Sequence, residues 1–280
     1  MAGLSAAAHA SRLGMKCLVV EKLVAGGGVC LARRVDSLLY TGDGWSFGRR
    51  LAEAARESGA IIQEGEEVMR ITGGEDELLV RTDLRVHRAR VVVVATGTGE
   101  KPLGVPGEGR LRGKGVHYCA QCAGFAYRNA KVAVVGGDLH AVRAAKFLAE
   151  MASEVLLLAP GLQPEAKALV EQAGVRLILG AEVLEFRGEE SLSAVVVGTG
   201  EGRRVLEVDG VFIYSGRKPN SELVDVAKDA DGYILVDSRM QTSKPGVLAC
   251  GGVVGRSSLA SSMGDGATAA FTAARRLGSV

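Results

Sequence analysis

The segment KVAVVGGDLHAVRAAKFLAE at residues 131–150 is the feature that most restricts the fold. It begins with an apolar run of strand length, passes through two glycines and continues with apolar residues at helical spacing. A second apolar run, EVLLLAP at 154–160, follows directly. A strand, a helix and another strand in this order predict a βαβ unit, whose two strands lie parallel in one sheet.

A comparable alternation of strands and helices opens the chain. Apolar patterns predict a helix at 4–13, a strand at 15–21, a second helix at 47–58 and a fully apolar strand at 91–95. The C-terminal part returns to short strands and a final helix at about 265–276. We therefore expect two βαβ-type units, with the end of the chain closing onto the first.

The length of 280 residues is sufficient for two domains. We place the first domain at residues 1–112 and 232–280, and an inserted second domain at 113–231. Aromatic residues make up only 4% of the chain, so the core must be built from Val, Leu and Ala. That composition suits an α/β fold with a parallel sheet.

Charge and cysteine content limit the class of protein. The net charge is +2 with both signs interspersed, and no run of like charge indicates a nucleic-acid or membrane surface. No apolar segment approaches the ~18–20 residues that span a bilayer, and we recognise no signal peptide. The five cysteines are few and odd in number, which favours a reducing compartment, and we expect the cytoplasm.

The segment GVHYCAQCAGF at 115–125 places Cys119 and Cys122 three positions apart. Zinc would need two further thiol or imidazole ligands, and the chain has no second C-x-x-C pair. We therefore favour a redox pair and predict no metal site; a vestigial pair without a partner flavin is the other alternative. A C-x-x-C at the start of a helix can have a lowered thiol pKa, which thiol–disulfide exchange requires.

The strand-to-helix turn of the second unit departs from a dinucleotide-binding turn. Gly136 and Ala141 fit the first and third positions of G-x-G-x-x-G/A, but Asp138 replaces the middle glycine that faces the pyrophosphate. About 20 residues further on, where an acid or basic side chains would meet the ribose, the chain reads APGLQ at 159–163. We predict a Rossmann-like unit that no longer binds a nucleotide.

The first unit shows only the second half of such a motif. Gly3 is in the position of a third glycine, and Glu21 ends the following strand, where a carboxylate can meet an adenosine ribose. The preceding strand and the first two glycines are absent. Either the chain begins inside the motif, or the motif was never present.

Taken together, these segments resemble the low-molecular-weight thioredoxin reductases. The cysteine segment precedes a second nucleotide turn, as in that family, and the other similar segments occur in family order along nearly the whole chain. They are AGLSAA at 2–7, VVEK at 19–22, the glycines at 26–28, VATG at 94–97, LGVPGE at 103–108, GRKPN at 216–220, MQTSKPGVLACG at 240–251 and GDGATAA at 264–270.

The resemblance implies two Rossmann-like domains, the second inserted in the first, in a homodimeric flavoprotein oxidoreductase. In that family, electrons pass from NADPH through FAD to a redox-active disulfide and on to thioredoxin. Cys119 and Cys122 would be the redox pair. Residues that would bind FAD are Gly3, Glu21, Lys22, Gly26, Gly27, Gly28, Thr96, Gly97, Gly251, Gly252, Val253, Ser258 and Leu259.

The chain departs from the family pattern at several of these positions. Ala123 replaces the acid that follows the second cysteine, and we consider His117 as its substitute in proton transfer, ordinary variation being the alternative. Gly252 replaces an aspartate, Gly28 a glutamine, and 257–258 an R-Q pair. With the opening strand also missing, the chain looks like a divergent, N-terminally truncated member.

We therefore predict a thioredoxin reductase-like enzyme that passes electrons through FAD to Cys119–Cys122 and on to a thioredoxin-like protein. Because the second nucleotide turn is altered, NADPH is doubtful, and we favour a ferredoxin-type donor. The alternative is a non-catalytic or truncated family member that no longer binds flavin. No nucleic acid or membrane partner is expected.

Overall fold

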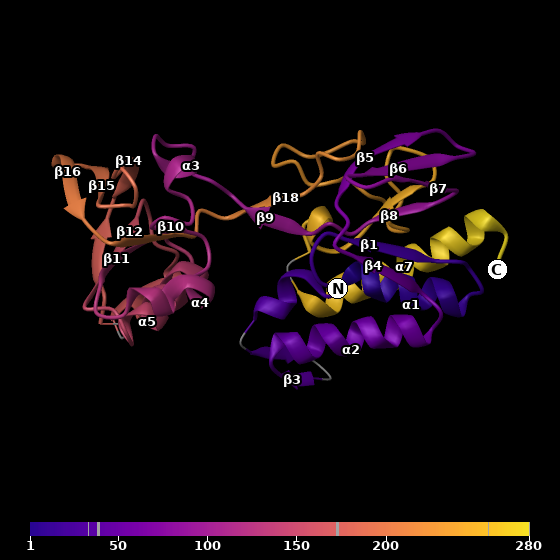
Figure 1. The fold of residues 1–280 in the computed structure, drawn as a ribbon, viewed down its shortest axis with the longest axis horizontal. Helices are drawn as coiled ribbons and strands as arrows, with labels where there is room; N and C mark the ends of the chain where they lie inside the picture. The colour runs from indigo at the N-terminus through magenta and orange to yellow at the C-terminus, as the bar shows by residue number, and fades with distance from the viewer. Residues whose placement is uncertain (33, 38–39, 172–173, 257, 280) are drawn as a thin grey trace. The chain divides into compact units, whose positions relative to one another are not determined.

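The computed structural model describes residues 1–280 except 33, 38–39, 172–173, 257 and 280. It divides into two compact units (Figure 1): unit 1 is Met1–Gly99 with Lys218–Val280, and unit 2 is Glu100–Arg217. In the sequence, unit 2 is thus inserted between the two segments of unit 1. Strands β9 (Thr98–Glu100) and β18 (Arg217–Pro219) pair where the chain passes between the units.

The boundaries of unit 2 lie earlier than the inserted domain expected at 113–231. Helix α3 (Glu108–Leu111) belongs to unit 2 because Leu111 is fully buried in that unit's core, beside Phe186. Val224 belongs to unit 1 because it packs there with Ile71 and Val253. The burial of Leu111 and Val224, which the local pattern does not reveal, shows to which unit each of these segments belongs.

Unit 2 contains the βαβ arrangement predicted from its sequence. Among the described residues, its parallel sheet has the order β10-β17-β11-β12-β13. Helices α5 (Leu139–Ala149) and α6 (Pro164–Glu171) follow β11 and β12. The strands are β10 (Val116–His117), β11 (Lys131–Val135), β12 (Glu154–Ala159), β13 (Arg176–Leu179) and β17 (Gly210–Ile213).

Alternation along β11 shows why this sheet forms the centre of unit 2. Val132 and Val134 pack with α5 on one face, whereas Ala133 and Val135 enter a second cluster on the other face. An antiparallel sheet of β14 (Glu182–Arg187), β15 (Ala194–Thr199) and β16 (Gly202–Glu207) contributes Phe186 to that second cluster. The unit is therefore layered as helices, parallel sheet and antiparallel sheet. Two short helical segments, α4 (Ala120–Ala123) and η2 (Gly124–Tyr127), follow β10.

Unit 1 is built around helix α1 (Ala2–Arg12), which packs against α2 (Gly44–Glu57) and α7 (Leu259–Leu277) (Figure 1). Helix α7 begins earlier than the sequence pattern predicts, because the Ser258 hydroxyl caps it by accepting the N–H of Ser261. The remaining elements are β1 (Leu18–Glu21), η1 (Gly27–Leu31), β2 (Val35–Ser37), β3 (Tyr40–Gly42), β4 (Ile61–Glu64), β5 (Val68–Gly73), β6 (Leu78–Thr82), β7 (Val86–Ala89), β8 (Val92–Val94), β19 (Val247–Ala249) and η3 (Gly251–Val254).

The parallel strands of unit 1 form two separate pieces, β1–β4 and β8–β19. Among the described residues, no further strand pairs with either piece. Helix α1 lies against both, because Leu4 packs with Val19 whereas Ala2 packs with Val93. β5, β6 and β7 form a third, antiparallel sheet.

None of the helices described in the structure has the length and apolarity needed to cross a membrane.

Candidate active site

Cys119 and Cys122 form a disulfide at the start of α4, with their Cα atoms 5.3 Å apart. Cys119 is half-buried and Cys122 is exposed, so the disulfide is accessible to another molecule. Cys119 is also the N-cap of α4, since its Sγ accepts the N–H of Cys122 at 3.2 Å. Within the described residues, Cys17, Cys30 and Cys250 are free thiols, and no group of His, Cys, Asp or Glu is arranged to hold a metal.

Tyrosine hydroxyls hold the redox segment, residues 117–123, from several directions. Tyr118 donates to Oε1 of Glu108 at 2.6 Å, and Tyr127 lies 2.7 Å from Nε2 of His117. The hydroxyl of Tyr214 accepts the N–H of Ala120 at 3.0 Å. Reasoning from the sequence missed these tyrosines as site residues, because their partners become neighbours only in the folded unit.

His117, the residue considered for proton transfer, lies in β10 against aromatic side chains. Its ring is stacked on Phe212 with centroids 5.4 Å apart and hydrogen-bonds to Tyr127. Burial lowers the pKa of His117 below its ordinary value of 6.5, so the imidazole is neutral at pH 7. These contacts explain the orientation of the ring, and a catalytic role for it remains a prediction.

Glu108 is a buried carboxylate that anchors the residue before Cys119. It is 4% exposed and accepts the N–H groups of Leu103 at 2.9 Å and Gly104 at 2.7 Å in addition to the Tyr118 hydroxyl. Burial, followed by the bond to Glu108, raises the pKa of Tyr118, so this hydroxyl remains a donor. The Arg112 guanidinium lies 5.0 Å from the centre of the Tyr118 ring.

The turn between β11 and α5 forms hydrogen bonds with the Asp138 side chain and with the backbone of the segment that follows β12. Asp138 caps α5, its Oδ1 accepting the N–H of Ala141 at 2.8 Å. The N–H of Gln163 donates to the Gly137 carbonyl at 2.9 Å, and a Cβ added to Gly137 would lie 1.8 Å from the Gly161 carbonyl. The backbone of 161–163 therefore lies directly against the turn.

Several of the glycines predicted to bind FAD lie together in unit 1. A Cβ on Gly251 would lie 2.7 Å from Ala2, and one on Gly252 would lie 3.3 Å from Cα of Gly97. A Cβ on Gly3 would lie 3.1 Å from the side chain of Ala95. The start of α1, the end of β8 and η3 therefore approach one another as closely as glycine permits.

Thr96 and Gly97 are held by Asn220, from the GRKPN segment. The Thr96 hydroxyl donates to the Asn220 carbonyl at 2.6 Å, and Nδ2 of Asn220 donates to the Thr96 carbonyl at 2.9 Å. The backbone N–H of Asn220 donates to Gly97 at 3.0 Å. Gly97 adopts a positive φ of 65° with open space beyond its Cα, so it leaves room for a ligand.

The loop after β1 carries the other predicted FAD residues. Glu21 accepts the N–H of Leu23 at 3.0 Å, while Lys22 forms an ion pair with Glu67 at 2.7 Å. Lys22 is thus already engaged within the protein. Gly26, buried at φ 119°, precedes Gly27 and Gly28, which are exposed and have open space beyond Cα. Glu64 secures this loop by accepting the N–H of Ala25 at 2.7 Å.

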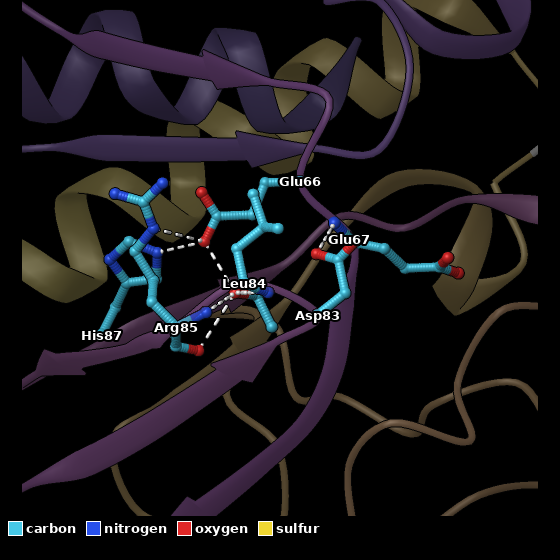
Figure 2. A network of polar contacts seen from close by, with 7 residues as sticks. Glu66, Glu67, Asp83, Leu84, Arg85 and His87 are labelled. Atoms are coloured by element: carbon cyan, nitrogen blue, oxygen red, sulfur yellow. Dashed lines mark hydrogen bonds and ion pairs between the residues drawn. The ribbon is translucent and has the colours of Figure 1, made fainter.

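A buried carboxylate, Glu66, is linked to Glu21, the residue before this loop, and Figure 2 shows its side chain facing Arg85 and His87. Its N–H donates to the Glu21 carbonyl at 3.1 Å, and its Oε1 lies 2.7 Å from both the Thr82 hydroxyl and Nε2 of His87. The bond to Thr82, with help from His87 and Arg85, lowers the pKa of Glu66. The other carboxylate oxygen of Glu66, Oε2, is buried and has no hydrogen-bond partner among the described residues.

The predicted FAD residues near α7 occupy different kinds of position. Val253 is fully buried in the core of unit 1 and its carbonyl accepts the N–H of Ile234, so its side chain faces no ligand. Ser258 caps α7, and Leu259 packs beside Val29. Ser257, part of the altered pair, lies outside the described residues.

Comparison with known proteins identifies the class. A family model described as pyridine nucleotide-disulphide oxidoreductase matches residues 1–273, and the chain belongs to that family. The chain is 34% identical to the thioredoxin reductase of Treponema pallidum (strain Nichols), across 98% of this chain and 93% of that protein.

Solved structures agree with this assignment. The thioredoxin reductase of T. acidophilum superposes with a TM-score of 0.86 and 32% identity, covering 97% of this chain and 94% of that one. The Lactococcus lactis thioredoxin reductase superposes with a TM-score of 0.91 and 26% identity, covering 100% and 96%. The chain is thus an oxidoreductase of the thioredoxin reductase type, a class of flavoproteins with a redox-active disulfide. The predicted family and its two Rossmann-like domains are confirmed.

Proposed function

We propose that this chain passes electrons through FAD to the Cys119–Cys122 disulfide and from there to a thioredoxin-like protein, with a ferredoxin-type donor in place of NADPH. The observation that carries the proposal is the disulfide itself, accessible through an exposed Cys122 in a chain of this family. We further assign unit 1 as the FAD-binding domain and unit 2 as the disulfide-carrying domain. A homodimer is proposed on the family resemblance.

FAD, when bound, supplies two-electron exchange between the donor and the disulfide. Gly97, Gly27 and Gly28 support the proposal because they leave open space, and Glu21 ends β1 where a ribose can be met. The residues proposed to hold it are Gly3, Glu21, Gly26, Gly27, Gly28, Thr96, Gly97, Gly251, Gly252 and Ser258, with Val253 and Leu259 acting through their backbones. Lys22 would contribute only after leaving Glu67.

The thiol step needs only the two cysteines and the partner. One thiolate of the reduced pair attacks a sulfur of the partner disulfide, forming a mixed disulfide and releasing one partner thiolate. The second cysteine then attacks the mixed disulfide, so that Cys119–Cys122 re-forms and the partner leaves as a dithiol. Two electrons and two protons reach the partner.

The donor is proposed from the state of the β11–α5 turn. A dinucleotide would bring its pyrophosphate beside the Asp138 carboxylate, to an α5 start that Asp138 already caps. The 159–163 segment contributes no basic side chain for a 2′-phosphate, and its backbone lies against Gly137. Each lost charge-assisted contact costs ~1.5–3 kcal/mol, which amounts to orders of magnitude in affinity.

The visible spectrum of the purified full chain with added FAD tests the proposal. A bound flavin band that reduced ferredoxin bleaches and NADPH leaves unchanged is the expected result. Bleaching by NADPH would overturn the choice of donor. A protein that remains colourless with excess FAD would overturn the enzyme assignment and favour the non-catalytic alternative.

A further inference from the structure

The strand order of unit 2 identifies where a ligand would ordinarily bind. From β11 the chain proceeds to β12 and β13 on one side, and β17 lies on the other side of β11. In open α/β sheets, ligands bind beyond the carboxyl ends of the strands at the point where the order reverses. In unit 2 that point lies between the ends of β11 and β17.

Tyr214, the first residue after β17, occupies this point. Its N–H donates to the Val135 carbonyl at 2.7 Å, and a Cβ on Gly136 would lie 2.5 Å from its carbonyl oxygen. Its ring is half-buried in the cluster that α5 forms with the sheet, and its hydroxyl accepts the N–H of Ala120 at 3.0 Å. Burial raises the pKa of Tyr214, so the phenol stays protonated at neutral pH.

We propose that Tyr214 is a positioning residue for the redox disulfide: from the strand-order reversal of unit 2, its hydroxyl holds the first N–H of α4 beside Cys119. The point where the strand order reverses then fixes the disulfide and does not bind a nucleotide. This inference rests on the proposed function only in requiring that Cys119 and Cys122 cycle between disulfide and dithiol.

The hydrogen bonds of α4 give the direction of the effect. In the disulfide, Cys119 Sγ already accepts the N–H of Cys122, and the fully buried Ala120 depends on Tyr214 for its acceptor. A buried donor without a partner is costly. After reduction the bond between Cys119 and Cys122 no longer fixes this turn, so the start of α4 can shift and the Ala120 N–H can reach water instead of depending on Tyr214. Loss of the Tyr214 hydroxyl therefore penalises the disulfide more than the dithiol.

The test is the thiol–disulfide equilibrium of the full chain with dithiothreitol. It is measured by alkylating the free thiols and determining the fractions of alkylated and unmodified protein by mass spectrometry. In this equilibrium the Cys119–Cys122 bond breaks to two thiols, while dithiothreitol loses two thiol protons and closes its own disulfide. We expect Tyr214→Phe to shift the constant toward the protein dithiol about five- to tenfold, equivalent to about 20–30 mV for this two-electron couple. Tyr233→Phe, the same change in unit 1, should leave it within about twofold.

Exchange of the Ala120 amide proton in the oxidised chain, followed by NMR, gives an independent second measurement, because it reports this one hydrogen bond directly. We expect this proton to exchange at least about tenfold faster in Tyr214→Phe than in the wild type, and at the wild-type rate in Tyr233→Phe. An unchanged constant in folded Tyr214→Phe, or an Ala120 amide that Tyr214→Phe leaves as well protected as in the wild type, would overturn the proposal. Neither measurement involves flavin or donor, so an error in the proposed donor leaves the result interpretable.

Discussion

The hydroxyl of Tyr118 lies 2.6 Å from Oε1 of Glu108, and this bond joins the residue before Cys119 to the segment by which the chain passes into unit 2. The same carboxylate holds the backbone of Leu103 and Gly104, a few residues after the boundary of the unit. One buried side chain thus connects the incoming segment with the redox disulfide.

Replacing Glu108 tests this anchor. In Glu108→Gln an amide replaces the carboxylate that accepts these three hydrogen bonds, and the amide NH2 group faces other donors. We therefore expect the free energy of unfolding to fall by about 3 kcal/mol. Urea denaturation of the full chain measures it. Glu100→Gln, which breaks an exposed ion pair with Arg112, should cost less than about 1 kcal/mol. Equal losses in the two variants would contradict a special role for Glu108.

Stability should depend on pH through Glu66. Its pKa is lowered from 4.5 in the folded chain, so its contribution is fully present above that value and is lost as the pH falls through the folded pKa. The stability difference between the wild type and Glu66→Gln should be constant from pH 7 to 5 and shrink below 4.5, as measured by urea denaturation. Glu67→Gln removes only an exposed ion pair and should show little difference at any pH. A Glu66→Gln difference that grows in acid would contradict the assignment.

His117 should titrate below its ordinary pKa of 6.5, because burial disfavours the imidazolium. Its contribution to stability is then present above pH 6.5 and declines as the pH falls, since the unfolded chain takes up the proton first. A pH series of histidine NMR spectra gives the midpoint directly. Tyr127→Phe should leave the midpoint below 6.5, because burial is the cause and not the bond to Tyr127. A midpoint at or above 6.5 would mean that the ring is not buried in solution.

The divided sheet of unit 1 should exchange its amide protons faster than the sheet of unit 2. Among the residues that the structure describes, β1 and β8 each pair with a single strand, and Leu18 at the start of β1 is 42% exposed. β11 pairs on both sides and its last four residues are buried. We expect amides of β1 and β8 to exchange at least about 100-fold faster than those of β11. Equal protection would show that another strand completes the sheet in solution.

The sequence predicts the parts of this fold whose signals are local. The apolar runs and the two glycines at 136–137 specify the βαβ unit of unit 2 without any tertiary information. The cysteine spacing likewise predicts a disulfide that the structure contains. The sequence does not predict where the inserted unit starts and ends, because only burial in the folded chain shows to which core Leu111 and Val224 belong.

Contacts between distant residues account for what the sequence could not reveal about the site. Lys22 looks like a free cation in VVEK, yet Glu67 neutralises it from the strand region beyond β4. Tyr214 looks like the end of an apolar strand, and only folding brings its hydroxyl to Ala120. Such pairings depend on sheet order and on side-chain reach, neither of which a single sequence specifies.

The bond between Thr96 and Asn220, 124 positions apart, has a consequence for the order of folding. Closing so long a loop in an unfolded chain carries a large entropic cost. Once unit 2 has folded, the Ser215 hydroxyl donates to the Lys101 carbonyl and brings the two chain crossings together. Residues 218–280 are synthesised after unit 2, so unit 2 can fold during synthesis and hold the two chain crossings together. Unit 1 is completed only after β19 and α7 have also been synthesised.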